Sequence, residues 1–140
     1  MELQEQDYLD TIMAFDYGNS RIGVAVKPAE ESGVEPLLTL KNDSDLWQTI
    51  EDLLNLHQPD LIIVGRPRNL EGESTKQTEL AEQFASELSK LYNNKIELID
   101  EALSTEQAKQ RIPKNLASKS RDVIDQYAAC IILESYLKEK

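Results

Sequence analysis

The sequence is poor in the residues that build disulfides and thiolate metal sites. It contains one cysteine and one histidine in 140 residues. The single cysteine, Cys130, cannot form an internal disulfide, and it has no neighbouring Cys or His with which to bind a metal. We therefore expect a reducing compartment, with Cys130 in a core position and His57 as a polar residue at a helix end.

Long apolar runs are also missing from the sequence. No uncharged apolar stretch approaches the length needed to cross a membrane. Residues 1–10 are polar and acidic, and they lack the basic and apolar regions of a secretion signal. These absences predict a cytoplasmic protein without membrane contact, in which residues 1–10 are a flexible segment and residues 11–138 form a single domain.

Positive charge is scarce as well, since the sequence has 15 Lys and Arg but 26 Asp and Glu, which gives a net charge of -11. Such a body repels phosphates, which argues against a general nucleic-acid coat protein. One segment, residues 109–121, nevertheless carries +5 and leaves -16 for the remainder. Its basic residues are Lys109, Arg111, Lys114, Lys119 and Arg121. The segment is either a solvated loop around Pro113 or a contact surface for phosphate groups.

The residues that are present alternate between strand and helix patterns. Strand patterns cover residues 12–15, 22–26, 36–40, 61–64 and 95–99. Helical spacing of apolar residues predicts a helix from residue 46 to about 56, a second after a capping box at Ser74 and Gln77, a short one from Ser104 to before Pro113, and a long one over residues 124–135. Residues 65–72 are predicted to be a loop.

This order predicts an α/β fold with a mixed five-stranded sheet flanked by helices. The first three strands follow one another closely and should pair antiparallel, whereas the later strands alternate with helices and should pair parallel. A ribonuclease-H-like layout satisfies this order.

Acidic residues fall at the predicted ends of two strands and at the start of the last helix. Asp16 ends the first strand, and the adjacent Gly18 would let backbone pass close to a phosphate or a metal. Asp100 and Glu101 end the last strand, and Asp125 lies beside the buried face of the final helix. Clustered carboxylates suit a hard divalent cation. The alternatives are turn chemistry for Asp16, helix capping for Asp100 or Glu101, and an ion pair of Asp125 with Arg121.

Two arginines, Arg66 and Arg68, follow the predicted buried strand 61–64. Side chains in a loop at this edge of the sheet can reach the phosphates of a nucleic acid. An ordinary exposed loop explains them equally well.

Four segments together resemble the YqgF family, the Holliday junction resolvase homologues that are also described as nucleases maturing the small-subunit ribosomal RNA precursor. The matching segments are AFDYG with RIGVAV (residues 14–18 and 21–26), PDLIIVG through P-x-NLEG (59–72), DE with LST (100–105), and Asp125 with AA and IILESYL (128–137). The resemblance covers nearly the whole chain.

The resemblance implies a ribonuclease-H-like fold and phosphodiester hydrolysis assisted by Mg²⁺ or Mn²⁺. Its acidic positions match Asp16, Glu101 and Asp125, which would be both metal-binding and catalytic. Two ions about 4 Å apart would activate a water and stabilise the departing oxygen, so that no Ser, Cys or His nucleophile is needed. The implied partner is nucleic acid, with the 16S rRNA precursor favoured and branched DNA as the alternative.

The sequence departs from the family pattern at two positions. Ala102 follows the Asp-Glu pair where the family usually has Arg, and Arg66 stands where it usually has an apolar residue. Arg66 could supply the missing charge from the neighbouring loop. The loss of Arg at position 102 leaves open a different class of function, a nucleic-acid-binding or scaffold protein that has kept the fold and lost turnover.

Overall fold

A computed structural model of the chain describes residues 3–93, 95–101, 105–115 and 120–139. Its strands are β1 (Ile12–Tyr17), β2 (Arg21–Lys27), β3 (Glu35–Lys41), β4 (Leu61–Pro67) and β5 (Lys95–Glu101). Its helices are α1 (Glu5–Leu9), α2 (Leu46–His57), α3 (Lys76–Leu91), α4 (Thr105–Arg111) and α5 (Arg121–Lys138). None of the helices within these ranges is long and apolar enough to cross a membrane.

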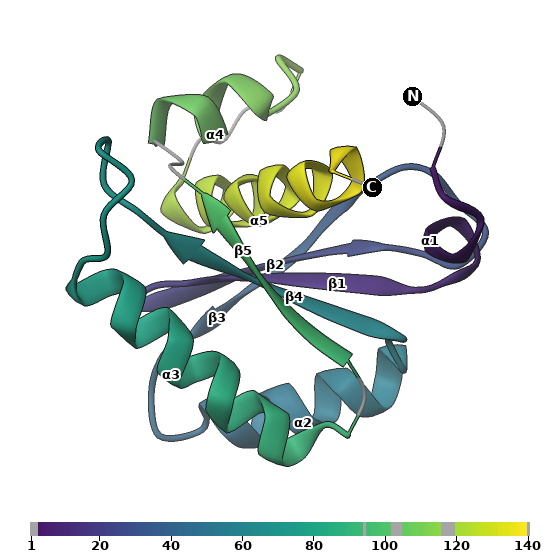
Figure 1. Ribbon diagram of the computed structural model, residues 1–140, viewed down its shortest axis with the longest axis horizontal. Coiled ribbons are helices and arrows are strands. Elements are labelled where there is room, and N and C mark those ends of the chain that lie inside the picture. The colour runs from purple at the N-terminus through teal and green to yellow at the C-terminus, as the bar shows by residue number, and fades with distance from the viewer. Residues whose placement is uncertain (1–2, 94, 102–104, 116–119, 140) are drawn as a thin grey trace.

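The five strands form one mixed sheet in the order β3-β2-β1-β4-β5. The β1–β2 and β2–β3 pairs are antiparallel, and the β1–β4 and β4–β5 pairs are parallel. This is the predicted arrangement. Helices α2 and α3 cover one face of the sheet, and α5 lies across the other with α4 stacked outside it (Figure 1).

Strand β1 lies in the middle of the sheet and is buried on both faces. Met13 and Phe15 belong to the apolar cluster under α2 and α3, whereas Ile12 and Ala14 pack with Ile132 of α5 and its neighbours. Since side chains alternate between faces, Asp16 follows Ile12 and Ala14 onto the α5 face. The burial pattern of β1 therefore directs one carboxylate towards α5.

The predicted core position of Cys130 is confirmed, whereas the capping box of α3 differs from the predicted one. Trp47 packs on Phe84 with ring centroids 5.4 Å apart, and Cys130 is a fully buried core residue whose thiol pKa burial raises to about 12. The capping box of α3 is formed by Thr75 and Thr78, one residue later than predicted, because the side chain of Thr75 accepts the backbone N–H of Thr78 and its backbone N–H is bound in return. The Ser104 box lies outside the described residues.

All five strands extend further than the sequence patterns predict, and the extension of β4 changes the surroundings of the site. Strand β4 continues through Pro67, so that Arg66 lies in a strand and not in a loop. Its register with β5 pairs Arg66 with Asp100 and Pro67 with Glu101. Backbone pairing with β5 overrides the turn signal of Gly65 and Pro67, because Pro67 stands at the last strand position, where its missing N–H costs little.

Within the N-terminal segment, whose predicted flexibility stays a prediction, residues 5–9 form helix α1. Asp7 is buried and accepts a hydrogen bond from the hydroxyl of Tyr136 at 3.3 Å. The fully buried Lys27 donates to the backbone carbonyls of Tyr8, Pro28 and Glu31 at 3.2, 2.7 and 2.9 Å. The contacts of Asp7 with Tyr136 and of Tyr8 with Lys27 join the segment to α5 and to the end of β2. The domain boundaries at residues 11 and 138 stay a prediction.

Candidate active site

The three predicted carboxylates line one cavity of about 160 Å³ at the carboxyl ends of β1, β4 and β5. Asp16 enters it from β1, Glu101 from β5 and Asp125 from α5. Gly65, Pro67 and Arg68 form the side contributed by β4 and the residue that follows it. Residues separated by more than 100 positions in the sequence are therefore brought together at the sheet edge where ligands collect in α/β folds.

Asp16 is the most strongly perturbed of the three carboxylates. Burial, followed by the negative charge of Asp125, raises the pKa of Asp16 from 3.8 to about 7. Placing two carboxylates in one poorly solvated cavity costs free energy unless a proton or a cation compensates. Such a perturbed pKa in a cleft is typical of a functional site.

Asp125 is held at the cavity by Arg21, the first residue of β2. The Nε of Arg21 donates to the Oδ2 of Asp125 at 2.6 Å, across 104 positions of sequence. The alternative ion pair of Asp125 with Arg121 is wrong, since the guanidinium that reaches Asp125 comes from the sheet below the helix and not from the preceding turn of α5.

Two glycines allow α5 to lie this close to the sheet. A Cβ on Gly23 would lie 1.9 Å from the backbone oxygen of Asp125, and one on Gly65 would lie 2.5 Å from the Cδ1 of Ile132. Gly23 is also the cross-strand partner of Asp16. The backbone of α5 therefore rests on the strand next to Asp16, which places Asp125 beside it.

Glu101 and Asp100, which compete for one role in the sequence, are separated by the pleat of β5. Glu101 lines the cavity, and its Oε2 is buried without a hydrogen-bond partner among the described residues. Asp100 accepts hydrogen bonds from Arg66 at 2.7 Å and from Arg68 at 3.3 Å, and the bond from Arg66 chiefly lowers the pKa of Asp100. Glu101 is thus the carboxylate available to a ligand in the cavity.

The donor set fits a hard divalent cation. A buried carboxylate oxygen without a partner and a carboxyl group with a raised pKa are both groups that a cation would satisfy, and all the acidic ligands offer oxygen. Within the described ranges, no three His, Cys, Asp or Glu side chains already converge as a complete ligand set. The carboxylates surround the cavity and would have to close on an ion.

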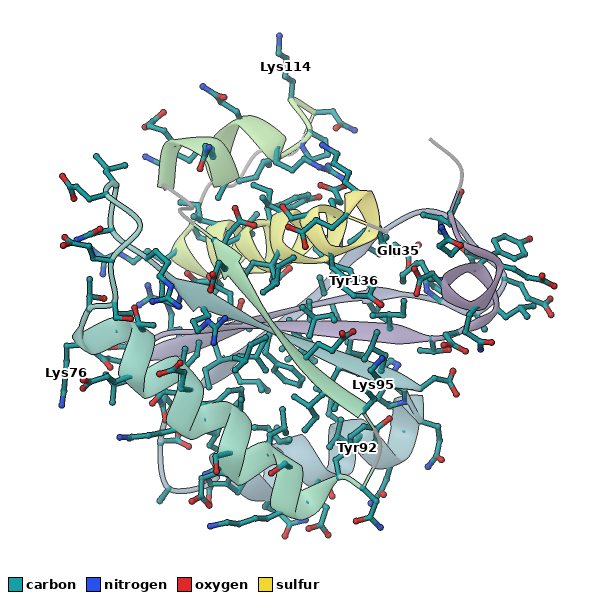
Figure 2. All side chains as sticks on the ribbon, viewed as in Figure 1. Glu35, Lys76, Tyr92, Lys95, Lys114 and Tyr136 are labelled. Carbon is teal, nitrogen blue, oxygen red and sulfur yellow. The ribbon has the colours of Figure 1, made fainter. Side chains whose placement is uncertain are left out.

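The predicted nucleic-acid-binding residues are not equivalent in the structure. Arg68 lines the cavity, whereas Arg66 is bound to Glu82 at 3.4 Å and to Asp100. In α4 and its flank, Lys109 pairs with Glu106 at 3.8 Å, and Lys114 points away from the body of the protein (Figure 2). Lys119 lies outside the described residues.

Arg111 and Arg121 sit at the two ends of the same basic segment, in different environments. Arg111 forms a bidentate ion pair with Glu134 of α5, with N–O distances of 3.2 and 2.7 Å. Its guanidinium carbon lies 5.8 Å from the centroid of the Tyr127 ring. Arg111 therefore docks α4 onto α5. Arg121 is exposed at the first turn of α5.

The sequence patterns do not predict the contributions of Arg21 and Gly23 to the site, and they predict a different role for Gly18. A glycine inside a strand signals close backbone approach, so Gly23 could have been found, but nothing local identifies Arg21 as the partner of Asp125. Gly18 belongs to the turn after β1, since a Cβ there would lie 2.6 Å from the backbone oxygen of Arg21.

Comparisons with known proteins agree with this geometry. The sequence model of one family, described as RuvX, Holliday junction resolvase, matches residues 10–139. A relative from Haemophilus ducreyi named "Putative pre-16S rRNA nuclease" is 38% identical over 90% of this chain and 94% of its own. One of the same name from Shewanella denitrificans is 35% identical over 93% and 95%.

Solved structures show the same fold at low sequence identity. Thermus thermophilus RuvC superimposes with a TM-score of 0.56 at 12% identity, over 92% of this chain and 96% of its own. The fowlpox virus Holliday junction resolvase gives 0.57 at 13% identity, over 93% and 99%. The predicted ribonuclease-H-like fold is confirmed. The chain belongs to the RuvX family, described as Holliday junction resolvases, which confirms both the predicted YqgF membership and the predicted nuclease class.

Proposed function

We propose that this protein hydrolyses phosphodiester bonds in the precursor of 16S rRNA with the help of Mg²⁺ or Mn²⁺, and that Asp16, Glu101 and Asp125 are its metal-binding and catalytic residues. The observation that carries the proposal is the convergence of these three carboxylates on one cavity at the carboxyl edge of the sheet. The names of the relatives support the choice of substrate.

The chain's own residues each have a part in the proposed reaction. Asp16, Glu101 and Asp125 would hold the divalent cations, which would supply activation of a water and stabilisation of the departing oxygen. Glu101 would offer its Oε2, which has no partner among the described residues, Asp16 would lose its proton to become a ligand, and Asp125 is oriented by Arg21. The apolar side chains of Ile124 and Ile132 bound the cavity and limit the access of bulk water.

A structured DNA is the second candidate substrate. It is favoured by the description of the family and by the likeness to junction resolvases. A protein that binds nucleic acid without cleaving it is the third candidate, because Ala102 replaces the usual arginine of the family. For the first candidate we infer a cytoplasmic location, where the precursor is made and where the thiol of Cys130 stays reduced.

One experiment separates these candidates. Purified protein is incubated with an end-labelled fragment of the 16S precursor and with a four-way DNA junction, each in Mn²⁺, Mg²⁺ or EDTA. We expect metal-dependent cleavage of the RNA at discrete positions, and no cleavage by the Asp16→Asn variant. Cleavage of the junction alone would transfer the assignment to DNA, and cleavage of neither substrate would favour the binding protein.

A further inference from the structure

Arg68 is fixed next to a proposed metal ligand by the backbone as well as by its side chain. Its backbone N–H donates to the carbonyl oxygen of Glu101 at 3.1 Å, which continues the β4–β5 pairing one residue beyond Pro67. The position of Arg68 relative to Glu101 is therefore as rigid as the sheet. In Figure 1 the chain leaves β4 at this point as a loop that first rises and then descends to α3.

The guanidinium of Arg68 is held from two directions and remains only partly used. Its Nε donates to the Oδ1 of Asp100 at 3.3 Å, and its Nη1 donates to the hydroxyl of Ser74. These contacts engage two of its five N–H donors within the part of the chain that the structure describes. The side chain is only 21% exposed, so burial and these contacts restrict its motion.

The acidic side chains near Arg68 do not fully neutralise its positive charge. Asp100 is shared, and its shorter contact, 2.7 Å, is to the Nε of Arg66. Arg66 has a second acidic partner in Glu82 and does not line the cavity. Arg66 is thus paired with two carboxylates, whereas Arg68 shares one of them and belongs to the lining of the cavity.

We propose that Arg68 binds a phosphate group of the nucleic-acid substrate at the rim of the cavity, and that Asp100 is a positioning residue that holds its guanidinium there. The planar guanidinium matches two phosphate oxygens at once, which a lysine does not. The inference deepens the proposed nuclease function and rests on it. Of the two arginines for which the sequence suggested contact with phosphates, it assigns that contact to Arg68.

Four variants of the full chain test the inference: Arg68→Ala, Arg68→Lys, Asp100→Asn and, as the matched control, Arg66→Ala. Affinity for the labelled precursor RNA is measured in Ca²⁺ at several salt concentrations, and kcat and KM in Mn²⁺. Because a hydrogen bond to a charged group is lost, Arg68→Ala should weaken binding about tenfold or more and lower the salt dependence by about one phosphate contact. Arg68→Lys should recover part of the affinity, and Arg66→Ala should bind within about twofold of wild type.

Asp100→Asn separates positioning from simple electrostatics. Removing a negative charge near a bound phosphate would by itself strengthen binding. If Asp100 positions Arg68, the variant instead binds more weakly, and it causes no further loss in the Arg68→Ala background. Thermal melting of each variant checks that it is folded. If Arg68→Ala is not folded, the comparison is made with Arg68→Lys.

Three outcomes would overturn the inference: binding by Arg68→Ala within twofold of wild type, an equal loss for Arg66→Ala, or tighter binding by Asp100→Asn. Wild-type protein that binds the RNA but does not cleave it contradicts the proposed nuclease function alone, and Arg68 is then judged on binding. Wild-type protein that binds no nucleic acid contradicts both.

Discussion

At the scale of single residues, the site holds carboxylates in surroundings that destabilise the folded protein when no cation is bound. Asp16 has neighbours that disfavour its charged form, since burial and Asp125 both raise its pKa. The Oε2 of Glu101 lacks a partner among the described residues. Both groups cost stability in the metal-free protein, and binding a cation would recover that cost.

The raised pKa of Asp16 predicts how the metal-free protein responds to pH. Because the folded-state pKa, about 7, exceeds the ordinary 3.8, the folded protein binds the proton more tightly between these values, and stability falls as pH rises from about 4 to about 7. In urea unfolding with EDTA, wild type should lose on the order of 2 kcal/mol between pH 5 and pH 8 relative to Asp16→Asn, which lacks this proton. Parallel pH curves for the two proteins would contradict the placement of Asp16.

Arg21 is expected to influence metal binding without touching the metal. Partners that orient a ligating carboxylate typically change metal affinity 10- to 100-fold, and Arg21 holds Asp125 at 2.6 Å. Arg21→Gln should therefore weaken Mn²⁺ binding, measured by calorimetry, by about that factor. Arg121→Gln removes the same charge one helical turn before Asp125 and should leave the affinity nearly unchanged. Tighter Mn²⁺ binding by Arg21→Gln would mean that Arg21 competes with the cation.

At the scale of elements, the decisive contact is that of α5 with the sheet. Gly23 of β2 and Gly65 of β4 carry no Cβ at the points where α5 crosses them. Ile132 fills the space over Gly65, and the backbone of Asp125 lies over Gly23. The helix thus approaches β2 closely enough to place its carboxylate beside Asp16, and a bulkier strand would hold it away.

Gly23→Ala should separate α5 from the sheet. The new Cβ would meet the Asp125 oxygen at 1.9 Å, and that atom belongs to the helix backbone, which cannot move alone. We expect a loss of about 2 kcal/mol or more in unfolding free energy, together with weaker Mn²⁺ binding. Gly33→Ala is the matched control, because nothing lies within 4 Å of its Cβ, and its stability should change by less than about 0.5 kcal/mol. Equal melting temperatures for the two variants would contradict the close contact.

At the scale of the whole molecule, the net charge of -11 opposes the binding of nucleic acid. The basic segment offsets this less than its composition suggests, since Arg111 and Lys109 are paired with Glu134 and Glu106. Among the described residues that line the cavity, Arg68 is the one that carries a positive charge, and cations bound by the carboxylates would add to it.

We expect RNA binding to depend on divalent cations even when cleavage is blocked. With Ca²⁺, the affinity of wild type for the precursor RNA should be at least about tenfold higher than in EDTA at the same ionic strength, because the cations neutralise carboxylates that otherwise repel the phosphates. Asp16→Asn should show a smaller dependence on Ca²⁺. Filter binding or fluorescence anisotropy measures both, and equal affinities with and without Ca²⁺ would refute the expectation.

The sequence by itself determined the strand order, the mixed sheet and the family, because hydrophobic periodicity and short motifs are local properties of the chain. It also identified Asp16, Glu101 and Asp125 as candidate site residues. It left open the choice between Asp100 and Glu101 and the choice between Arg66 and Arg68. Only the tertiary structure decided between them. The pleat and register of β4 and β5 direct Glu101 to the cavity and pair Asp100 with Arg66, and Arg68, the residue after β4, lines the cavity. The contact of Arg21 with Asp125 spans 104 positions and exists only once α5 rests on Gly23, so no local pattern could have encoded it.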